Sequence, residues 1–272
     1  RACRALAKQH PSVTGVEALA ALIDAAQPRL VAAEAAAALA AWRTPAAIAA
    51  LIARWPTLRC PRRRRDLAKA LGACRGSAEV GARLITWADE DPSRGVAGEL
   101  LAARGRLDVA GATAELRSRL DRPSWNDRLR AGILRGLGDC LEPAAVESVL
   151  GVLADDAAHL NARTAAAAAA AKLGANLPLA TVRCRLALVR ALESPRVHLR
   201  LAVAKALGDL GDTAALPALA AAQEREIYAL VTRALREAAE RLRGVAAGRD
   251  RADRRAPEGD ADRFDEQAAD GG

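Results

Sequence analysis

A repeat is the feature that most constrains what this chain can fold into. A leucine near the expected end of a helix, followed in most units by Gly or Ala, recurs every 30 to 36 residues. A period in this range, sustained along a whole chain, is typical of a solenoid, in which stacked units bury their apolar faces against each other. The anchor leucines are Leu6, Leu39, Leu71, Leu101, Leu137, Leu173, Leu207 and Leu242.

Each unit is predicted to be a helix, a short turn and a second helix, and Ser194–Gln223 is the clearest example. Ser194 and Pro195 predict a helix start, since Ser is a good N-cap and Pro fits the first turn. Apolar residues follow at helical spacing, and Gly208–Asp212 predicts the break. A second amphipathic helix is expected from Leu216. The same order is predicted for residues 31–52, 64–87 and 124–153.

Composition favours helices over strands. Ala accounts for 71 of the 272 residues and aromatic residues for only 2%. Ala is the best helix former, whereas sheet cores need β-branched and aromatic residues. Small residues also let stacked helices approach closely, which fits the alanine tracts at 35–38 and 165–171. We therefore expect an all-α protein, a right-handed α-solenoid of about seven helical pairs.

We expect this solenoid to span residues 1–243, with its first unit cut within a repeat because Arg1 is not a natural start. Residues 244–272 have Phe264 as their largest apolar residue, and they carry five Arg against eight Asp or Glu. Such a segment buries too little apolar surface to offset its ordering entropy, so a disordered tail is predicted. The total charge of +8 then divides into −3 for the tail and +11 for the repeats.

One unit resembles a known repeat family. The residues Val197–Asp212, followed by Ala215–Leu219, resemble a HEAT-like repeat of the bacterial type. A narrower resemblance covers Arg122–Asp127, Leu129–Gly132 and Leu134–Gly138, which are similar to the HEAT-like C-terminal region of bacterial M1-family zinc aminopeptidases. That resemblance implies an accessory domain that packs on a catalytic domain and limits substrate entry. The implied partner is a protein or peptide, including the part of the chain that would precede Arg1.

The catalytic motif of those peptidases is missing from this sequence. Their H-E-x-x-H motif needs two His one helical turn apart, with a Glu that activates water. The chain has His10, His159 and His198, none of which is followed by Glu. Asp155 and Asp156 near His159 could form a metal site, but a polar turn is the favoured interpretation. We therefore predict no catalytic residue, metal or cofactor for this chain.

Two groups of arginines are candidates for an interaction surface. Arg62–Arg65 could contact phosphate or an acidic partner, or could be a solvated helix start. A second group lies seven residues before the anchor leucines. Its members are expected to brace neighbouring repeats through Asp139, Asp209 or Asp212, and the alternative is an exposed basic stripe. The candidate residues are Arg62, Arg63, Arg64, Arg65, Arg94, Arg130 and Arg200.

The remaining distinctive residues have structural interpretations. The four Trp are spread one per unit, which favours core or inter-helix packing over base stacking. Phe264 could anchor a short partner contact, although an unused tail residue is favoured. The five Cys are scattered and no signal peptide is visible at 1–9, so we expect free thiols in the cytoplasm.

Three functions remain as hypotheses. The first is a non-catalytic scaffold for a protein or peptide, as the accessory domain of an M1-like aminopeptidase. The second is a stand-alone basic module that binds nucleic acid or an acidic partner; nucleic acid is the less favoured of the two, and no membrane contact is expected. The third is an enzyme-like HEAT protein such as the phycobilin lyase relatives, for which the sequence has no distinctive residue.

Overall fold

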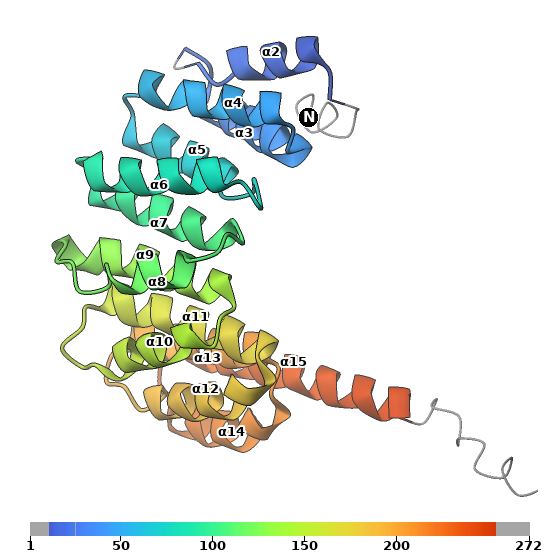
Figure 1. Cartoon of the computed structure of the whole chain (residues 1–272). Coiled ribbons are helices and arrows are strands. Elements are labelled where there is room, and N and C mark those ends of the chain that lie inside the picture. The colour runs from blue at the N-terminus through green and yellow to red at the C-terminus, as the bar shows by residue number, and fades with distance from the viewer. Residues whose placement is uncertain (1–10, 25, 254–272) are drawn as a thin grey trace, which may run out of the picture.

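The computed structural model describes residues 11–24 and 26–253, and every regular element within them is a helix. The helices stack into an arc that begins at α2 and ends with α12 to α15 (Figure 1). The predicted all-α solenoid is confirmed. Arg1, Cys3, Leu6, His10 and Phe264, which bear on the predictions above, lie outside the described part.

Alternate helices form two layers, because the odd-numbered helices from α3 to α15 pack on one another in succession. The odd layer consists of α3 (Arg29–Trp42), α5 (Pro61–Leu71), α7 (Arg94–Arg106), α9 (Arg128–Cys140), α11 (Leu160–Asn176), α13 (Val197–Leu210) and α15 (Ala229–Asp253). The even layer consists of α2 (Val13–Ala21), α4 (Pro45–Arg54), α6 (Ala78–Glu90), α8 (Ala112–Arg117), α10 (Ala144–Ala154), α12 (Pro178–Ala191) and α14 (Leu216–Arg225). Each layer therefore has seven helices within the described residues.

Small residues determine how closely the odd helices approach. A Cβ atom on Gly132 of α9 would lie 2.1 Å from the carbonyl oxygen of Gly98 in α7. A Cβ atom on Gly105 would lie 2.1 Å from the carbonyl oxygen of Gly136. The two backbones are thus in direct contact, which larger side chains would prevent.

The alanine tract belongs to the most enclosed part of the solenoid. Helix α11 packs against α9, α10, α12 and α13, so most of its circumference is covered. Its alanines at 166, 167, 169 and 170 are buried. Ala is favoured there because it combines high helix propensity with a small contact radius. The expectation that the tract is a packed repeat helix is therefore confirmed.

The short turns follow ordinary capping chemistry. Thr44 and Ser77 cap α4 and α6 by accepting hydrogen bonds from the N–H groups of residues 47 and 80. Pro45 and Pro178 occupy the first helical position, where no N–H is needed. Helix α13 ends at Gly211, whose φ of 75° is easily adopted only by glycine.

One predicted boundary is wrong. Helix α13 begins at Val197 rather than beside Ser194, whose hydroxyl instead accepts a hydrogen bond from the Arg196 N–H. The break predicted at Gly208–Asp212 is confirmed, with Gly211 after the last helical residue, whereas Gly208 lies inside the helix and allows Ala238 of α15 to approach.

The predicted end of the repeats at 243 also differs from the structure. Helix α15 continues to Asp253, because Ala and Arg are good helix formers even where little is buried. The rest of the predicted tail, 254–272, lies outside the described residues.

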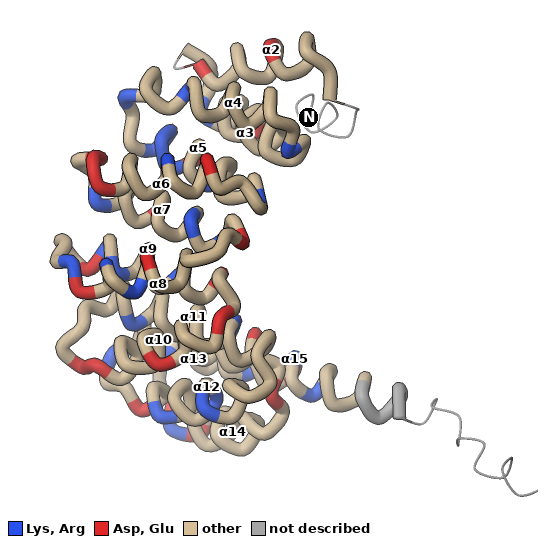
Figure 2. The backbone as a smooth tube through the Cα atoms, viewed as in Figure 1, with Lys and Arg blue, Asp and Glu red and all other residues tan. Residues whose placement is uncertain are grey.

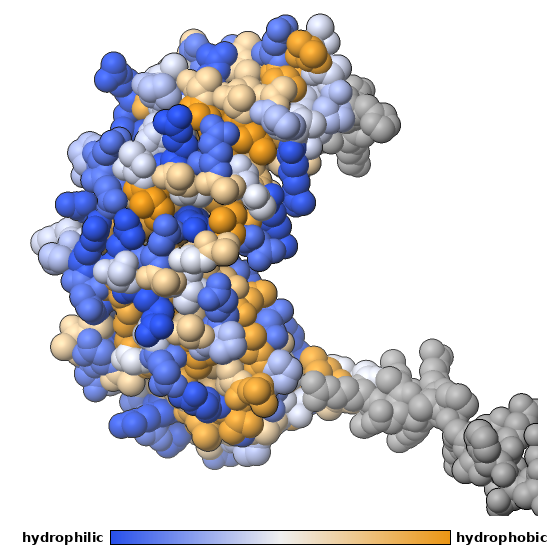
Figure 3. Space-filling view, in the orientation of Figure 1, coloured by the Kyte–Doolittle hydropathy of each residue, from blue (hydrophilic) through white to orange (hydrophobic). Residues whose placement is uncertain are grey.

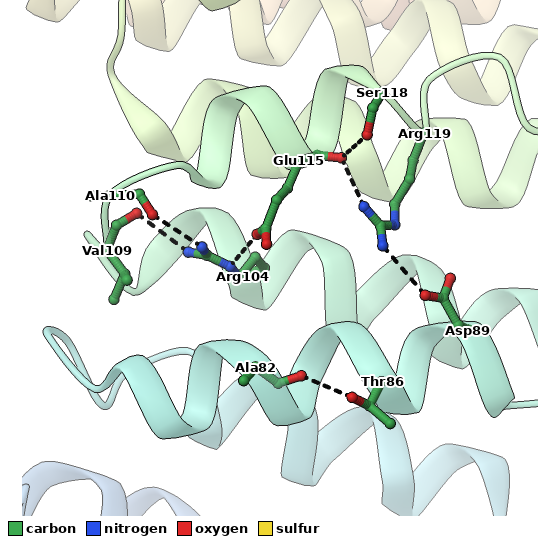
Figure 4. Close-up of polar contacts among 9 residues, drawn as sticks. All are labelled: Ala82, Thr86, Asp89, Arg104, Val109, Ala110, Glu115, Ser118 and Arg119. Atoms are coloured by element: carbon green, nitrogen blue, oxygen red, sulfur yellow. Dashed lines mark hydrogen bonds and ion pairs between the residues drawn. The ribbon is translucent and has the colours of Figure 1, made fainter.

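The shortest α-helix, α8, is held by polar contacts in addition to its buried Ala112 and Leu116. Buried Arg104 of α7 donates its Nε–H to Glu115 at 2.8 Å and its terminal N–H groups to the carbonyls of Val109 and Ala110 (Figure 4). Arg119 links the carbonyl of Glu115 to Asp89 of α6. A helix of six residues buries little apolar area, and these polar contacts add to its stability.

Candidate interaction surface

The two layers differ in charge. Helices α3 to α13 of the odd layer contain 16 Lys or Arg and 5 Asp or Glu, whereas α4 to α14 of the even layer contain 7 and 6. Figure 2 marks these residues along the backbone. The excess positive charge of the repeats is therefore concentrated in the odd layer. The exposed cations of α3 to α13 in this layer are Arg29, Arg62, Lys69, Arg94, Arg128, Arg135, Lys172 and Lys205.

Two arginines of the odd layer brace the turn of the following repeat. Arg64, the fourth residue of α5, pairs with buried Asp91 at 3.2 Å from Nε to Oδ2. Arg200, the fourth residue of α13, binds both carboxylate oxygens of Glu226, at 2.7 and 2.9 Å. Arg200 also donates to the carbonyl of Ser194 at 2.8 Å. A bidentate pair of this kind strengthens the interaction and also fixes the relative orientation of the two side chains.

The surroundings of Glu226 favour its ionised form. Hydrogen bonds from Arg200, which outweigh the opposing effect of burial, hold the pKa of Glu226 below its ordinary value. The guanidinium of Arg200 lies 5.8 Å from the centre of the Tyr228 ring, within cation–π range. Tyr228 thus adds a contact to the arginine of this pair.

Two other arginines reach back to the turn before their own helix. Arg130 donates to the carbonyl of Leu120 at 3.1 Å and also contacts Asp121. Arg163, which is 5% exposed, donates to the carbonyl of Leu153 at 3.1 Å and binds Asp156 at 2.7 Å. Arg130 was among the arginines predicted to brace a turn, whereas Arg163 was not.

The membership and the acid partners of this group differ from the prediction. Arg94 is the exposed first residue of α7 and does not occupy the bracing position. Arg163 takes part instead. Spacing missed it because α11 is 17 residues long, so its anchor Leu173 follows Arg163 by ten residues rather than seven. The three acids that we named pair with other cations: Asp139 with Lys172, Asp209 with Arg241, and Asp212 with Arg185.

The run Arg62–Arg65 is divided between different surroundings. Arg63 donates to the carbonyls of Asp24 and Gln27, and Arg64 braces Asp91. Arg62 is exposed and Arg65 is half-buried. The run therefore does not form one continuous patch, because successive residues of a helix point in different directions.

An alternating ion network crosses the odd layer. Buried Glu99 of α7 contacts Arg106 at 3.2 Å and Arg135 of α9 at 3.5 Å. Arg106 also contacts Asp139 of α9 at 3.8 Å, and Asp139 in turn pairs with Lys172 of α11. Three cations thus share two carboxylates over three helices.

A hollow of about 240 Å³ adjoins this network at the C-terminal ends of the odd helices. The sequence analysis did not single it out, because only Arg43 and Arg75 share a repeat position, four residues after the anchors Leu39 and Leu71. Its lining residues are Arg43, Gly72, Ala73, Arg75, Arg106, Asp139 and Lys172.

Two larger hollows lie near the N-terminal ends of odd helices, beside the turns that precede these helices. They measure about 600 and 490 Å³ and share the turn residues 193–195. Arg200 lines the first and Arg163 the second, so the bracing arginines form part of their walls. Ile227 and Leu186 are exposed apolar residues at their rims. Figure 3 shows how hydrophobic and hydrophilic residues alternate over one face of the arc.

The tryptophans follow the prediction of core or inter-helix packing with one exception. Trp55 and Trp87 come from neighbouring even-layer segments and stack, with ring centres 4.6 Å apart and planes 10° apart. Trp55 belongs to the core, and Trp42 and Trp87 pack against it. Trp125 is 77% exposed, in the short 3₁₀ turn Trp125–Asp127, and does not pack in the core as predicted.

The acidic turn near His159 has structural contacts. Asp156 binds Arg163, and Asp155 accepts a hydrogen bond from the backbone of Ala157. His159 Nδ1 accepts the N–H of Asn161 and so caps α11. In the described part of the chain, no three His, Cys, Asp or Glu side chains converge as metal ligands.

Cys60 differs from the other described thiols. Hydrogen bonds from the backbone N–H groups of Arg63 and Arg62, supported by their charges, lower the pKa of Cys60. Burial raises the pKa of Cys74 to about 11 and also raises that of Cys184. The thiolate is the reactive form, so Cys60 is the most nucleophilic of the three.

We expect iodoacetamide at neutral pH to label Cys60 at least about tenfold faster than Cys74 or Cys184, because both exposure and thiolate fraction favour it. Peptide mapping by mass spectrometry after short exposures measures each rate. In the unfolded chain the three rates should converge. Equal rates in the folded chain would contradict this assignment.

Comparisons with known proteins identify the fold. No family model matches the chain, and no curated protein sequence matches it significantly. The complex of CpcE and CpcF of phycocyanin lyase from Nostoc sp. is 22% identical with a TM-score of 0.52, over 86% of this chain and 97% of that one. Human deoxyhypusine hydroxylase is 22% identical with a TM-score of 0.45, over 90% and 91%. An engineered protein is 20% identical with a TM-score of 0.44, over 84% and 68%.

Nothing in these comparisons links the chain to an aminopeptidase. Among the described residues, no helix has both the length and the apolar character needed to cross a membrane. At this level of identity, likeness to the lyase complex shows the architecture alone. The chain is an α-solenoid of HEAT-like helical pairs.

Proposed function

We propose that this chain is a non-catalytic scaffold whose odd layer binds an acidic segment of a partner protein. The observation that carries the proposal is the unequal charge of the layers, 16 cations against 5 acids in α3 to α13. A layer of one sign attracts ligands of the other sign and raises their association rate. The exposed cations Lys69, Arg135 and Lys205, at the eighth or ninth position of α5, α9 and α13, would form the middle of this surface.

The spacing of the layer suits an extended peptide. Neighbouring packed helices lie about 8–10 Å apart. A polyproline II segment rises about 3.1 Å per residue and has three residues per turn, so every third side chain lies on one face about 9 Å from the last. An acidic residue at every third position would therefore meet one helix of the odd layer after another.

A protein partner is favoured over nucleic acid. Glu99, Asp139 and Asp209 belong to the same layer and would repel a continuous row of phosphates. Base stacking on a protein uses several aromatic rings on one face. Trp55 and Trp87 are stacked on each other in the even layer, and Trp125 stands alone at a turn. Nucleic acid is therefore the second outcome to test.

The proposal is tested by measuring the binding of labelled peptides of about 15 residues with fluorescence anisotropy. One peptide has Glu at every third position, a second has the same Glu residues clustered, and a third has Gln in their place. We expect the first to bind best and the third to bind least. Binding should weaken as salt rises from about 50 to 200 mM, since the attraction is electrostatic.

Equal binding of the Glu and Gln peptides would contradict the proposal. A DNA or RNA oligonucleotide of equal length that binds more tightly than every peptide would favour the nucleic-acid hypothesis instead. Its affinity should then fall steeply over the same salt range because of counterion release.

The wider context is a separate part of the proposal. The resemblance over Arg122–Gly138 supports a place beside the catalytic domain of an M1-like aminopeptidase. Reading the coding frame upstream of Arg1 tests it. A frame that encodes H-E-x-x-H would support this context, and a start codon just before Arg1 would contradict it.

A further inference from the structure

We infer that the hollow at the C-terminal ends of the odd helices is a carboxylate subsite, which receives one acidic side chain or the chain terminus of the partner. The inference rests on the proposed function, because it assigns one place within the basic layer. Four cations and one acid line the hollow: Arg43, Arg75, Arg106, Lys172 and Asp139. They come from the ends of α3, α5, α7, α9 and α11 or from the turns that follow them.

Two of the cations are available to a ligand. Arg43 and Arg75 are exposed, and no Asp or Glu among the described residues forms an ion pair with either one. Two unpaired guanidinium groups at one hollow repel each other unless an anion lies between them. A carboxylate there would accept hydrogen bonds from both, and bidentate binding to Arg is its preferred geometry.

The backbone that carries these arginines is well defined. Arg43 ends α3 in the left-handed conformation, with a φ of 52°. The turn after α5 is tied to α7, because the N–H of Gly76 donates to the carbonyl of Leu107 at 2.7 Å. Arg75 itself donates its N–H to the carbonyl of Ala73 at 2.9 Å. A ligand would therefore meet guanidinium groups on ordered turns, which lowers the entropy cost of binding.

The other two cations are partly neutralised. Lys172 and Arg106 both contact Asp139, and Arg106 also contacts Glu99. Asp139 is thus an internal competitor, since it occupies donors that an incoming carboxylate could use. Removing its charge should strengthen binding of a carboxylate, whereas removing the charge of Arg43 or Arg75 should weaken it.

The size of the hollow limits the ligand. Pockets for drug-sized ligands and cofactors span roughly 300–1,000 Å³, and this hollow has about 240 Å³. A single carboxylate with its first few carbon atoms fits, whereas a nucleotide does not. Helix C-termini carry partial negative charge that attracts cations without any ligand. That effect explains the gathering of cations but predicts no gain in binding when Asp139 is neutralised.

The test uses the full chain and the peptide with Glu at every third position. The variants are Arg43→Gln with Arg75→Gln, Asp139→Asn alone, and Arg83→Gln as the control, since Arg83 is an exposed arginine of even-layer α6. We expect the double variant to raise the Kd about tenfold. Asp139→Asn should lower the Kd several-fold, and Arg83→Gln should change it less than about twofold. Circular dichroism confirms that each variant is folded.

The outcomes separate the subsite from the wider proposal. If the chain binds the peptide and the double variant binds it as well as the Arg83 variant does, the subsite is refuted and the scaffold proposal stands. Unchanged or weaker binding by folded Asp139→Asn also refutes the subsite. If the unaltered chain binds no acidic peptide at low salt, both ideas are wrong.

Discussion

Replacing Gly105 by Ala is expected to lower the free energy of unfolding by about 3 kcal/mol, since overpacking of a tight contact costs about 1–3 kcal/mol and occasionally more. The new Cβ would lie 2.1 Å from the carbonyl oxygen of Gly136, and backbone atoms cannot rotate away as a side chain can. Helices α7 and α9 must therefore separate. For a chain of this size the midpoint of thermal unfolding should fall by roughly 5–10 °C.

Gly151→Ala is the matched control. Gly151 is an exposed residue of α10, and a Cβ atom there would meet nothing within 4 Å. The same chemical change should raise stability by about 0.5–1 kcal/mol, because Ala has the better helix propensity. Thermal unfolding followed by circular dichroism measures both. A Gly105→Ala variant as stable as Gly151→Ala would show that the close approach of α7 and α9 is not required.

Replacing Arg200 by Leu is expected to cost about 3 kcal/mol, because removing one partner of a buried ion pair costs about 3–5 kcal/mol and Leu recovers some packing. The side chain of Glu226 is only 4% exposed and would keep the hydrogen bond from the Tyr228 N–H but lose both hydrogen bonds from Arg200. Arg200→Lys should restore little, since one ammonium group cannot reproduce the bidentate geometry.

The same pair predicts a pH dependence. Arg200 lowers the folded-state pKa of Glu226, so its contribution is present above the unfolded pKa and is lost as pH falls through the folded value. In Arg200→Leu, Glu226 keeps the hydrogen bond from the N–H of Tyr228 but loses those from Arg200, so burial opposes its ionised form more effectively. The stability difference between the two chains should therefore shrink as pH falls below about 4. Urea titrations at several pH values measure this, and a constant difference would contradict it.

Glu226→Gln is the control for which partner of the ion pair costs more stability when it is left alone. Arg200 would keep its bond to the carbonyl of Ser194 and its contact with Tyr228. Because Arg200 is long and reaches solvent more easily than Glu226, the loss should be smaller, on the order of 1 kcal/mol. A larger loss for Glu226→Gln than for Arg200→Leu would refute this account.

Several features could be derived from local patterns. The anchor spacing and alanine content predicted an all-helical solenoid, because apolar periodicity and helix propensity act within one turn of the chain. Pro45 and Thr44 predicted the start of α4 for the same reason. The bracing role of Arg200 followed from its recurring place in the repeat.

Other features depended on contacts between segments. The residues around Gly208 are compatible both with a helix break and with a continuous helix. In the structure Gly208 lies inside α13, where it contacts Ala238 of α15. Trp55 and Trp87 are 32 residues apart, and only the stacking of α4 on the next pair brings their rings together. Arg163 was missed because the length of α11 displaced its anchor.

By itself the sequence determined the helices, their order and the excess of positive charge, since propensity, periodicity and composition are properties of the chain. Only the tertiary structure decided where that charge lies. Alternate helices enter different layers, so 16 cations gather in helices α3 to α13 of the odd layer. It also brought Arg43, Arg75 and Lys172 to one hollow, because stacking makes neighbours of residues that are more than 30 positions apart.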